Sequence, residues 1–445
     1  MSATKNQLNE CTKSELDLFY VPPTNTSIDS GYWSHVFPST SIENNTGPIE
    51  FLVNASPEYI HLNQTILFLT LRFNKKSSSN TTSIETLLDG AAFGPVNNFA
   101  SSLFSQIDVV VGDKSIETTN ATYPYKAYIT NLLNYGEGAK KSHLQSCMFY
   151  MDTPGDMESF EKSETTIANK GLAARKQLVI KGKGQVELLT RLHSDFFNSD
   201  RFLLNNIRMK VTLTRNKPAF YMMMKNGEDI ECVISKAELL VRRVRVNPQI
   251  MYAHSLALQK STAKYPIKRS MVVPYTIGSG LLEFKTPNLA STILPQRIIV
   301  GLVDHHAFTG DYSLNPFNFQ TFNLRKLQLS LNSNNIVYPN GLDFDFDTDS
   351  YVQGYQSLFE DTGFVEITGN GIDRQAYARG YTLVNFDLSP DLCCGEHLNV
   401  KKSGDLVLTV SFKQPLTQAV TLIVYSEFEN LIEIDESRVV STDYA

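Results

Sequence analysis

Residues 231–277 read ECVISKAELLVRRVRVNPQIMYAHSLALQKSTAKYPIKRSMVVPYTI, and this stretch decides the fold of the chain. Its first part alternates small or apolar residues with mostly charged ones, which is the two-residue period of a half-buried strand. The small or apolar positions are Ser235, Ala237, Leu239 and Val241. After the doublet Arg242–Arg243 the apolar phase slips by one residue, and such a slip predicts a β-bulge.

A short helix is expected after this strand. Asn247 is a good N-cap, and Pro248 suits the first helical position. Apolar residues then recur at helical spacing, at Ile250, Ala253 and Ala257. We expect Pro266 to end the helix and a new strand to continue to Ile277. The order strand, helix, strand near the middle of the chain indicates a joint between two domains.

The chain has the length of two domains and the composition of a β protein. Its 445 residues exceed one ordinary core, whereas two β-sandwiches of about 200 residues each would account for them. Phe (26) and Tyr (20) are abundant, which favours strands. The net charge of −6 argues against a protein that coats nucleic acid by itself, so we expect no sequence-specific nucleic-acid binding.

The two halves of the chain repeat one order of elements. Strands are expected in the first half at 49–53, 65–73, 105–111, 177–180, 186–192, 207–214 and 232–246, with a helix opening at Tyr123. Strands are expected in the second half at 264–277, 280–285, 296–303, 324–331, 381–388, 405–412 and 419–435, with a helix at 351–359. Residues 152–176 are polar and are interpreted as a long loop.

This repeat predicts an all-β chain made of two jelly rolls in tandem. No alternation of strands and helices appears, so a parallel sheet is disfavoured. About eight antiparallel strands in two sheets with long connections form a jelly roll, and each half contains one short helix. The expected domains are an N-terminal arm (1–48), jelly roll 1 (49–246), a linker helix (247–263), jelly roll 2 (264–435) and a C-terminal tail (436–445).

The sequence offers few candidates for chemistry. It has no phosphate-binding loop, no zinc-protease motif and no serine-hydrolase elbow. The run Asp304-His305-His306 follows a strand and has the residue types of a metal or acid–base site, or of an ordinary polar loop. We therefore predict that the chain is not an enzyme and has no catalytic, cofactor-binding or metal site.

Four aspartates alternate along one segment: Asp343, Asp345, Asp347 and Asp349. Carboxylates at this spacing can collect Ca²⁺, but the glycine and glutamate that a calcium-binding EF-hand loop needs are replaced by Thr348 and Gly354. The other interpretation is a charged strand edge with Phe344 and Phe346 directed inward.

Basic residues flank the central helix at Arg242, Arg243, Arg245, Lys264, Lys268 and Arg269. They could form a nucleic-acid-binding face, or they could make contacts at the joint or between subunits, which the acidic total favours.

The cysteines and the apolar segments indicate in which environment of the cell the chain resides. The five cysteines are Cys11, Cys147, Cys232, Cys393 and Cys394, and their spacing fits no metal site. We expect reduced thiols, although the adjacent pair Cys393–Cys394 could form a vicinal disulfide. The N-terminus has no apolar signal segment, and the longest apolar runs, such as 298–303, are too short to span a bilayer.

Short motifs spread over nearly the whole chain carry a resemblance to a known family. They include Leu16-Asp17-Leu18-Phe19, Gly31-Tyr32-Trp33, Gly94-Pro95-Val96-Asn97, Tyr123-Pro124-Tyr125, Arg191-Leu192-His193, Thr262-Ala263-Lys264-Tyr265-Pro266, Asn315-Pro316-Phe317-Asn318-Phe319 and Tyr425-Ser426-Glu427-Phe428. Taken in this order, the motifs resemble those of the double jelly-roll major capsid proteins of Polinton (Maverick) elements and adintoviruses. The pair Cys393–Cys394 is not part of that pattern.

The resemblance implies a structural protein of a virion capsid. Three copies would form a pseudo-hexagonal capsomer, and capsomers would tile an icosahedral shell around double-stranded DNA. The implied partners are neighbouring capsomers, a single jelly-roll penton protein and minor capsid proteins. Synthesis would take place in the host cytoplasm and assembly in the host nucleus or cytoplasm. The loops 74–95 and 152–176 and both termini would contact neighbouring subunits or build the outer surface.

Two other functions stay open from the sequence. A jelly-roll sandwich can also bind glycans, although a single tryptophan in 445 residues offers few aromatic platforms. The chain could also be the product of a capsid gene that resides in a host genome and has another role.

Overall fold

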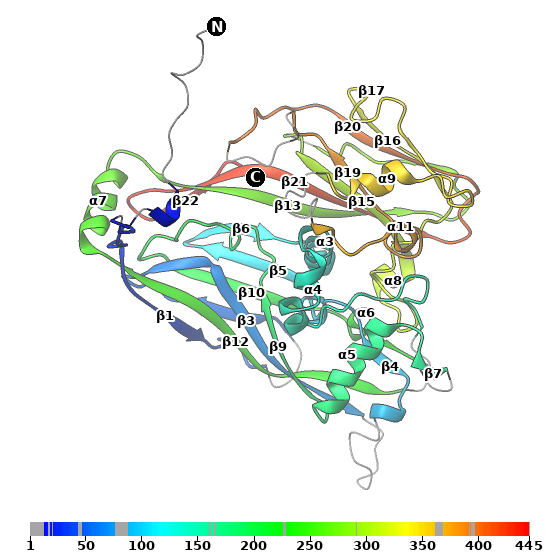
Figure 1. Cartoon of the computed structure of the whole chain (residues 1–445), viewed down its shortest axis with the longest axis horizontal. Coiled ribbons are helices and arrows are strands. Elements are labelled where there is room, and N and C mark those ends of the chain that lie inside the picture. The colour runs from blue at the N-terminus through cyan, green and yellow to red at the C-terminus, as the bar shows by residue number, and fades with distance from the viewer. Residues whose placement is uncertain are drawn as a thin grey trace.

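In the computed structural model the chain folds into two β-sandwiches that lie against each other (Figure 1). The structure describes residues 13–16, 18–19, 21–42, 47–75, 88–159, 162–163, 166–225, 228–290, 292–360, 368–390, 392 and 397–444. Among these residues, no helix has the length and apolar character that crossing a bilayer requires.

The first sandwich consists of two four-stranded antiparallel sheets. One sheet has the order β1 (Ile28–Val36), β12 (Ile230–Val246), β3 (Tyr59–Lys75) and β9 (Gln185–Arg191). The other has the order β2 (Ile49–Val53), β10 (Met209–Arg215), β5 (Phe104–Val111) and β6 (Lys114–Thr118). The first strand of the sandwich therefore pairs with its last, which is the closure expected of a jelly roll.

The second sandwich repeats this order. One sheet runs β13 (Ala263–Ile277), β21 (Val420–Ile434), β15 (Arg297–Asp304) and β19 (Leu383–Asp387), with β22 (Val440–Thr442) also beside β21. The other runs β14 (Glu283–Lys285), β20 (Leu406–Phe412), β16 (Leu324–Leu331) and β17 (Asn334–Asn335), with β18 (Leu342–Asp343) also beside β16. β13 pairs with β21, the last long strand, just as β1 pairs with β12, so the predicted all-β double jelly roll is confirmed.

Helices and short strands fill the connections. In the described part of the chain, the helices of four or more residues are α2 (Phe99–Ser102), α3 (Tyr123–Asn134), α4 (Glu137–Lys140), α5 (Lys170–Lys181), α6 (Pro218–Tyr221), α7 (Pro248–Leu258), α8 (His305–Thr309), α9 (Val352–Ser357) and α11 (Arg374–Ala378). The 3-10 turns are η1 (Ser14–Leu16) and η2 (His143–Cys147), and the remaining strands are β4 (Phe93–Pro95), β7 (Lys162–Ser163), β8 (Thr166–Ile167) and β11 (Met222–Met224).

The central stretch has the predicted order of strand, helix and strand. The register of β12 against β3 shifts between Leu240 and Arg242, directly before the arginine doublet. The side chain of Asn247 accepts a hydrogen bond from the backbone of Gln249 and caps α7, as its sequence indicates. The prediction that Pro266 ends this helix is wrong, because α7 ends at Leu258 and Pro266 lies inside β13. That strand is the edge of its sheet, where proline is tolerated.

Two other predictions differ from the structure. Residues 177–180 were expected to form a strand but belong to α5, because Asn169 caps that helix and Leu172 and Val179 share its buried face. Residues 28–36, which fall within the predicted arm, form β1 and pair with β12.

The apolar contact between the sandwiches centres on α3. Nearly every residue of this helix is buried, which is expected of a helix enclosed on all sides. The ring of Tyr128 stacks on Phe317, with centroids 4.1 Å apart and planes 6° apart. Tyr125 packs against the same ring edge to face and also contacts Phe308. Residues of the first sandwich thus share one aromatic cluster with residues of the second.

We expect Phe317→Ala to lower the free energy of unfolding by about 3–5 kcal/mol, because it leaves a cavity in this cluster. Phe37→Ala is the matched control, since Phe37 is 61% exposed and its loss should change stability by less than about 1 kcal/mol. Urea denaturation of both variants checks this. Equal effects would show that Phe317 does not join the sandwiches.

Candidate functional site: a polar cleft at the joint

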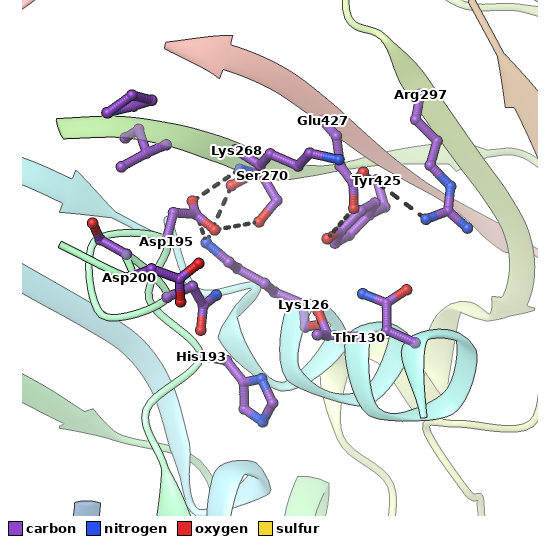
Figure 2. Close-up of a pocket in the computed structure, with 15 residues that line it drawn as sticks. Lys126, Thr130, His193, Asp195, Asp200, Lys268, Ser270, Arg297, Tyr425 and Glu427 are labelled. Atoms are coloured by element: carbon purple, nitrogen blue, oxygen red, sulfur yellow. Dashed lines mark hydrogen bonds and ion pairs between the residues drawn. The ribbon is translucent and has the colours of Figure 1, made fainter. Parts of the chain in front are cut away.

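A cleft of about 450 Å³ lies between α3 and the second sandwich (Figure 2). The side chains of Lys126, Thr130 and Asn134 line it from α3, since a spacing of four residues places them on one face. Strands β13, β15 and β21 form the opposite wall. The segment after β9 closes one end with His193 and Asp195. The cleft is therefore built by both sandwiches.

The ammonium group of Lys126 is the buried centre of the cleft. It forms an ion pair with Asp195 at 2.7 Å and another with Glu117 of β6. It also donates to the backbone oxygen of Ser270, 3.3 Å away in the second sandwich. The backbone nitrogen and hydroxyl of Ser270 donate in turn to Asp195, at 2.8 and 2.7 Å. One cation thus links α3, β6 and β13.

The ionisation of this cluster follows from its burial. Burial disfavours the charged form of Lys126, but the carboxylates of Asp195 and Glu117 outweigh it and raise the pKa of the ammonium. Burial, and then the neighbouring Asp195 carboxylate, raise the pKa of Glu117 although Lys126 acts against them. Both carboxylates are committed to the same cation, so neither is free for acid–base work.

Arg297 and Glu427 form the other end of the cleft. Arg297 of β15 donates through Nε to Asn385 at 3.0 Å, and its Nη1 lies 3.9 Å from Glu427. The hydroxyl of Tyr425 donates to Glu427 at 2.9 Å. These groups contact one another within the second sandwich, but Nη2 of Arg297 is buried there without a hydrogen-bond partner among the described residues.

A second polar link lies deeper between the sandwiches. Arg175 of α5 is fully buried and pairs with Asp152 at 2.6 Å. The other oxygen of Asp152 accepts from Asn315 at 3.1 Å, and its backbone oxygen accepts from Tyr381 at 2.7 Å. Asn315 and Tyr381 belong to the second sandwich. No sequence pattern predicted this link, because residues 152–176 were interpreted as a polar loop, whereas residues 170–176 belong to α5.

The candidate Asp304-His305-His306 forms a helix start. The side chain of Asp304 accepts from the backbone of His306 at 2.7 Å and caps α8, and Gln418 donates to it as well. Nδ1 of His305 lies 3.0 Å from the hydroxyl of Thr421. Among the residues that the structure describes, no three side chains of the metal-binding types gather in one place.

Three of the four aspartates of 343–349 lie against lysines, and Asp349 accepts a hydrogen bond from the hydroxyl of Tyr351 at 3.3 Å. Lys413 pairs with Asp345 at 3.3 Å and with Asp347 at 2.7 Å, and Lys326 lies 3.6 Å from Asp343. Phe344 is buried and stacks on the partly buried Phe346, so both rings point inward as the strand-edge interpretation expects.

The basic residues around α7 are used within the chain. Arg243 is buried and donates to the hydroxyl of Ser56 and to a backbone oxygen 3.2 Å away. Arg242 covers the ring of Trp33 at 5.7 Å, and Arg269 lies between the rings of Phe428 and Tyr444. Trp33 itself is 40% exposed. Arg242, Arg243 and Arg269 thus make their contacts within the chain.

Two cysteines can be described. Cys147 and Cys232 are buried thiols, and burial raises the pKa of the Cys147 thiol to about 12. Both thiols are therefore poor nucleophiles. Cys11 and the pair Cys393–Cys394 lie outside the described residues.

Comparison with known proteins gives the fold a wider context. No family model matches the chain. An uncharacterized protein of Caenorhabditis elegans is 23% identical over 427 residues, which cover 94% of this chain and 98% of that protein. The similarity runs along almost the whole length of both chains.

Solved structures match the whole two-sandwich arrangement. A chain of the Sputnik virophage matches with a TM-score of 0.67 at 10% identity, covering 99% of this chain and 94% of its own. The PBCV-1 virus capsid matches at 0.56 and 11% identity, over 96% of this chain and 99% of the other. The faustovirus major capsid protein matches at 0.55 and 8% identity, over 94% and 92%. The chain therefore has the double jelly-roll fold that viral major capsid proteins also have.

We expect Lys126→Met to lower the free energy of unfolding by about 3–5 kcal/mol, because it leaves two buried carboxylates without their cation. Adding Glu117→Gln and Asp195→Asn to that variant removes both charges and should restore part of the loss. Denaturation of the single and triple variants measures the difference. A triple variant less stable than the single one would contradict this account.

Lys140 gives the joint a dependence on pH. Its buried ammonium donates to the backbone oxygens of Leu132 and Asn370, and burial lowers its pKa to about 7. An unfolded lysine titrates near 10.4, so between about pH 7 and 10 the unfolded chain holds an extra proton. The free energy of unfolding should therefore rise with pH, by about 1 kcal/mol per pH unit from this group. Lys140→Met should remove this slope, whereas Lys141→Met, whose side chain is 73% exposed, should keep it.

Proposed function

We propose that this chain is a viral major capsid protein that assembles into homotrimers. The observation that carries the proposal is the double jelly-roll fold itself, matched over 99% of the chain by a chain of the Sputnik virophage. The crystal structure of the mavirus major capsid protein also matches, with a TM-score of 0.50 at 12% identity over 99% of this chain and 97% of that one. The described part of the chain is occupied by two packed sandwiches and their connections.

The geometry of the chain suits a shell. Each chain supplies two similar sandwiches held in one orientation, so three chains related by a threefold axis present six similar units. Such a trimer approximates a hexagon and can tile an icosahedral capsid. In this proposal the capsid encloses double-stranded DNA, and pentons and minor capsid proteins complete it. The motifs quoted above support a place in the Polinton and adintovirus lineage.

The net charge and the placement of the basic side chains support a role that does not require sequence-specific binding of nucleic acid. The net charge is −6, and most of the basic side chains near α7 pair with groups of their own chain. A capsid of this kind holds its genome by enclosure.

A genome-resident gene with another role is the second candidate. The observation that favours it is the similarity to a Caenorhabditis elegans protein over almost the whole chain, since that protein belongs to an animal. The fold would be the same in both cases, and assembly separates the two candidates.

Purified full-length chain should run as a trimer of about 150 kDa, three times 49.9 kDa, in light scattering after size exclusion. Negative-stain electron microscopy should show hexagonal capsomers, because six similar sandwiches surround one axis. A chain that stays monomeric between pH 5 and 9 and from low to high salt would overturn the capsid proposal. Binding of that monomer on a glycan array would support the glycan-binding alternative.

A further inference from the structure

Helix α7 joins the two sandwiches but packs poorly on both of them. No residue of this fully described helix is buried, although most of its side chains are apolar. Tyr252 is 67% exposed and Leu256 is 44% exposed. Figure 1 shows the helix at one end of the molecule, outside the layers of strands. A helix this apolar is expected to have a partner that covers it.

A groove separates α7 from the body of the chain. Its volume is about 550 Å³, within the range of about 300–1,000 Å³ typical of ligand sites. Ile250 and Leu258 of α7 form one wall, and Tyr59, Phe202 and Tyr265 form the other. Arg201 and Lys264 also line it, and none of the described residues that line it is acidic.

The N-terminal segment 15–21 has the complementary character. Its sequence is ELDLFYV, with two carboxylates among apolar residues. The apolar side chains that the structure describes here are strongly exposed, with Phe19 at 94% and Leu18 at 77%. None of them lines the groove of its own chain.

We propose that the α7 groove binds residues 15–21 of a second copy of this chain. Leu16, Leu18 and Phe19 fill the apolar floor, while Glu15 meets Arg201, since Lys264 already pairs with Glu433 of its own chain. Each chain has one such segment and one such groove, so the contact is reciprocal or closes a ring. Burial of the exposed apolar side chains stabilises the contact, and the pair of Glu15 with Arg201 fixes the direction of the segment.

The geometry of the segment favours a second copy over its own chain. Ser27 and Ile28 line the groove, so segment 15–21 ends only a few residues before the part of the chain that reaches it. Pro22–Pro23 lie between them and hold the backbone extended, which opposes the sharp reversal that docking in the same chain would need. An extended segment instead reaches a neighbouring molecule.

This inference rests on the proposed self-assembly, and photo-crosslinking tests it directly. A benzophenone amino acid replaces Leu16 in an affinity-tagged full-length chain, which is mixed with untagged chain and irradiated. Mass spectrometry should find adducts between the two chains within residues 246–265. Adducts within one chain, or adducts elsewhere on the partner, would overturn the assignment.

Substitution separates this contact from assembly as a whole. Phe19→Asp should lower the yield of the inter-chain adduct at least tenfold and weaken association by a similar factor. Val352→Asp is the matched control, because Val352 is 52% exposed and stands at the start of α9, where an aspartate is tolerated. If trimers form normally with no adduct at the groove, the capsid proposal stands and this one fails. If no oligomer forms in the unsubstituted chain, the capsid proposal fails first.

Discussion

The ammonium group of Lys126 is removed from water at the point where the two sandwiches meet. Such a charge is tolerated only when its partners are in place, and those partners come from separate parts of the chain. Glu117 lies in β6, Asp195 follows β9, and Ser270 belongs to β13. Until the second sandwich has docked, the hydrogen-bonding of this cluster is incomplete. A buried ion cluster of this kind contributes more to the specificity of one arrangement of the two sandwiches than to the free energy of unfolding.

The joint between the two sandwiches contains both apolar and polar contacts, and the two kinds have different effects. The stack of Tyr128 on Phe317 excludes water and supplies burial, but rings can slide over one another at little cost. The link from Arg175 through Asp152 to Asn315 is directional, because each hydrogen bond fixes a distance and an angle. Together they hold two similar sandwiches as one rigid body. The proposed role in a closed shell requires a unit whose two sandwiches keep one arrangement.

Alternating strands could be predicted from the sequence, whereas contacts between distant segments could not. β16 and β20 have one buried and one partly exposed face, and their bounds are close to those predicted. β1 was missed because almost all of its residues are exposed or partly exposed, which leaves no two-residue period to detect. The buried Arg175 was missed for another reason. Arg175 pairs with Asp152, which also accepts a hydrogen bond from Asn315, and these partners come from other segments of the chain. No local sequence pattern predicts a contact between distant segments.

The two prolines of β13, Pro266 and Pro274, affect whether copies of this chain aggregate at high concentration. β13 is an edge strand, and an edge with free backbone donors invites another strand to add to it. A proline offers no such donor, so a continuous ladder between two molecules is interrupted twice along this edge. Between the two prolines, the backbone of Ser270 and Val272 is already bonded to Asp195 and Thr122 of the first sandwich, which leaves little of this edge open to another strand. The same edge thereby guards against the irreversible sheet growth of aggregates.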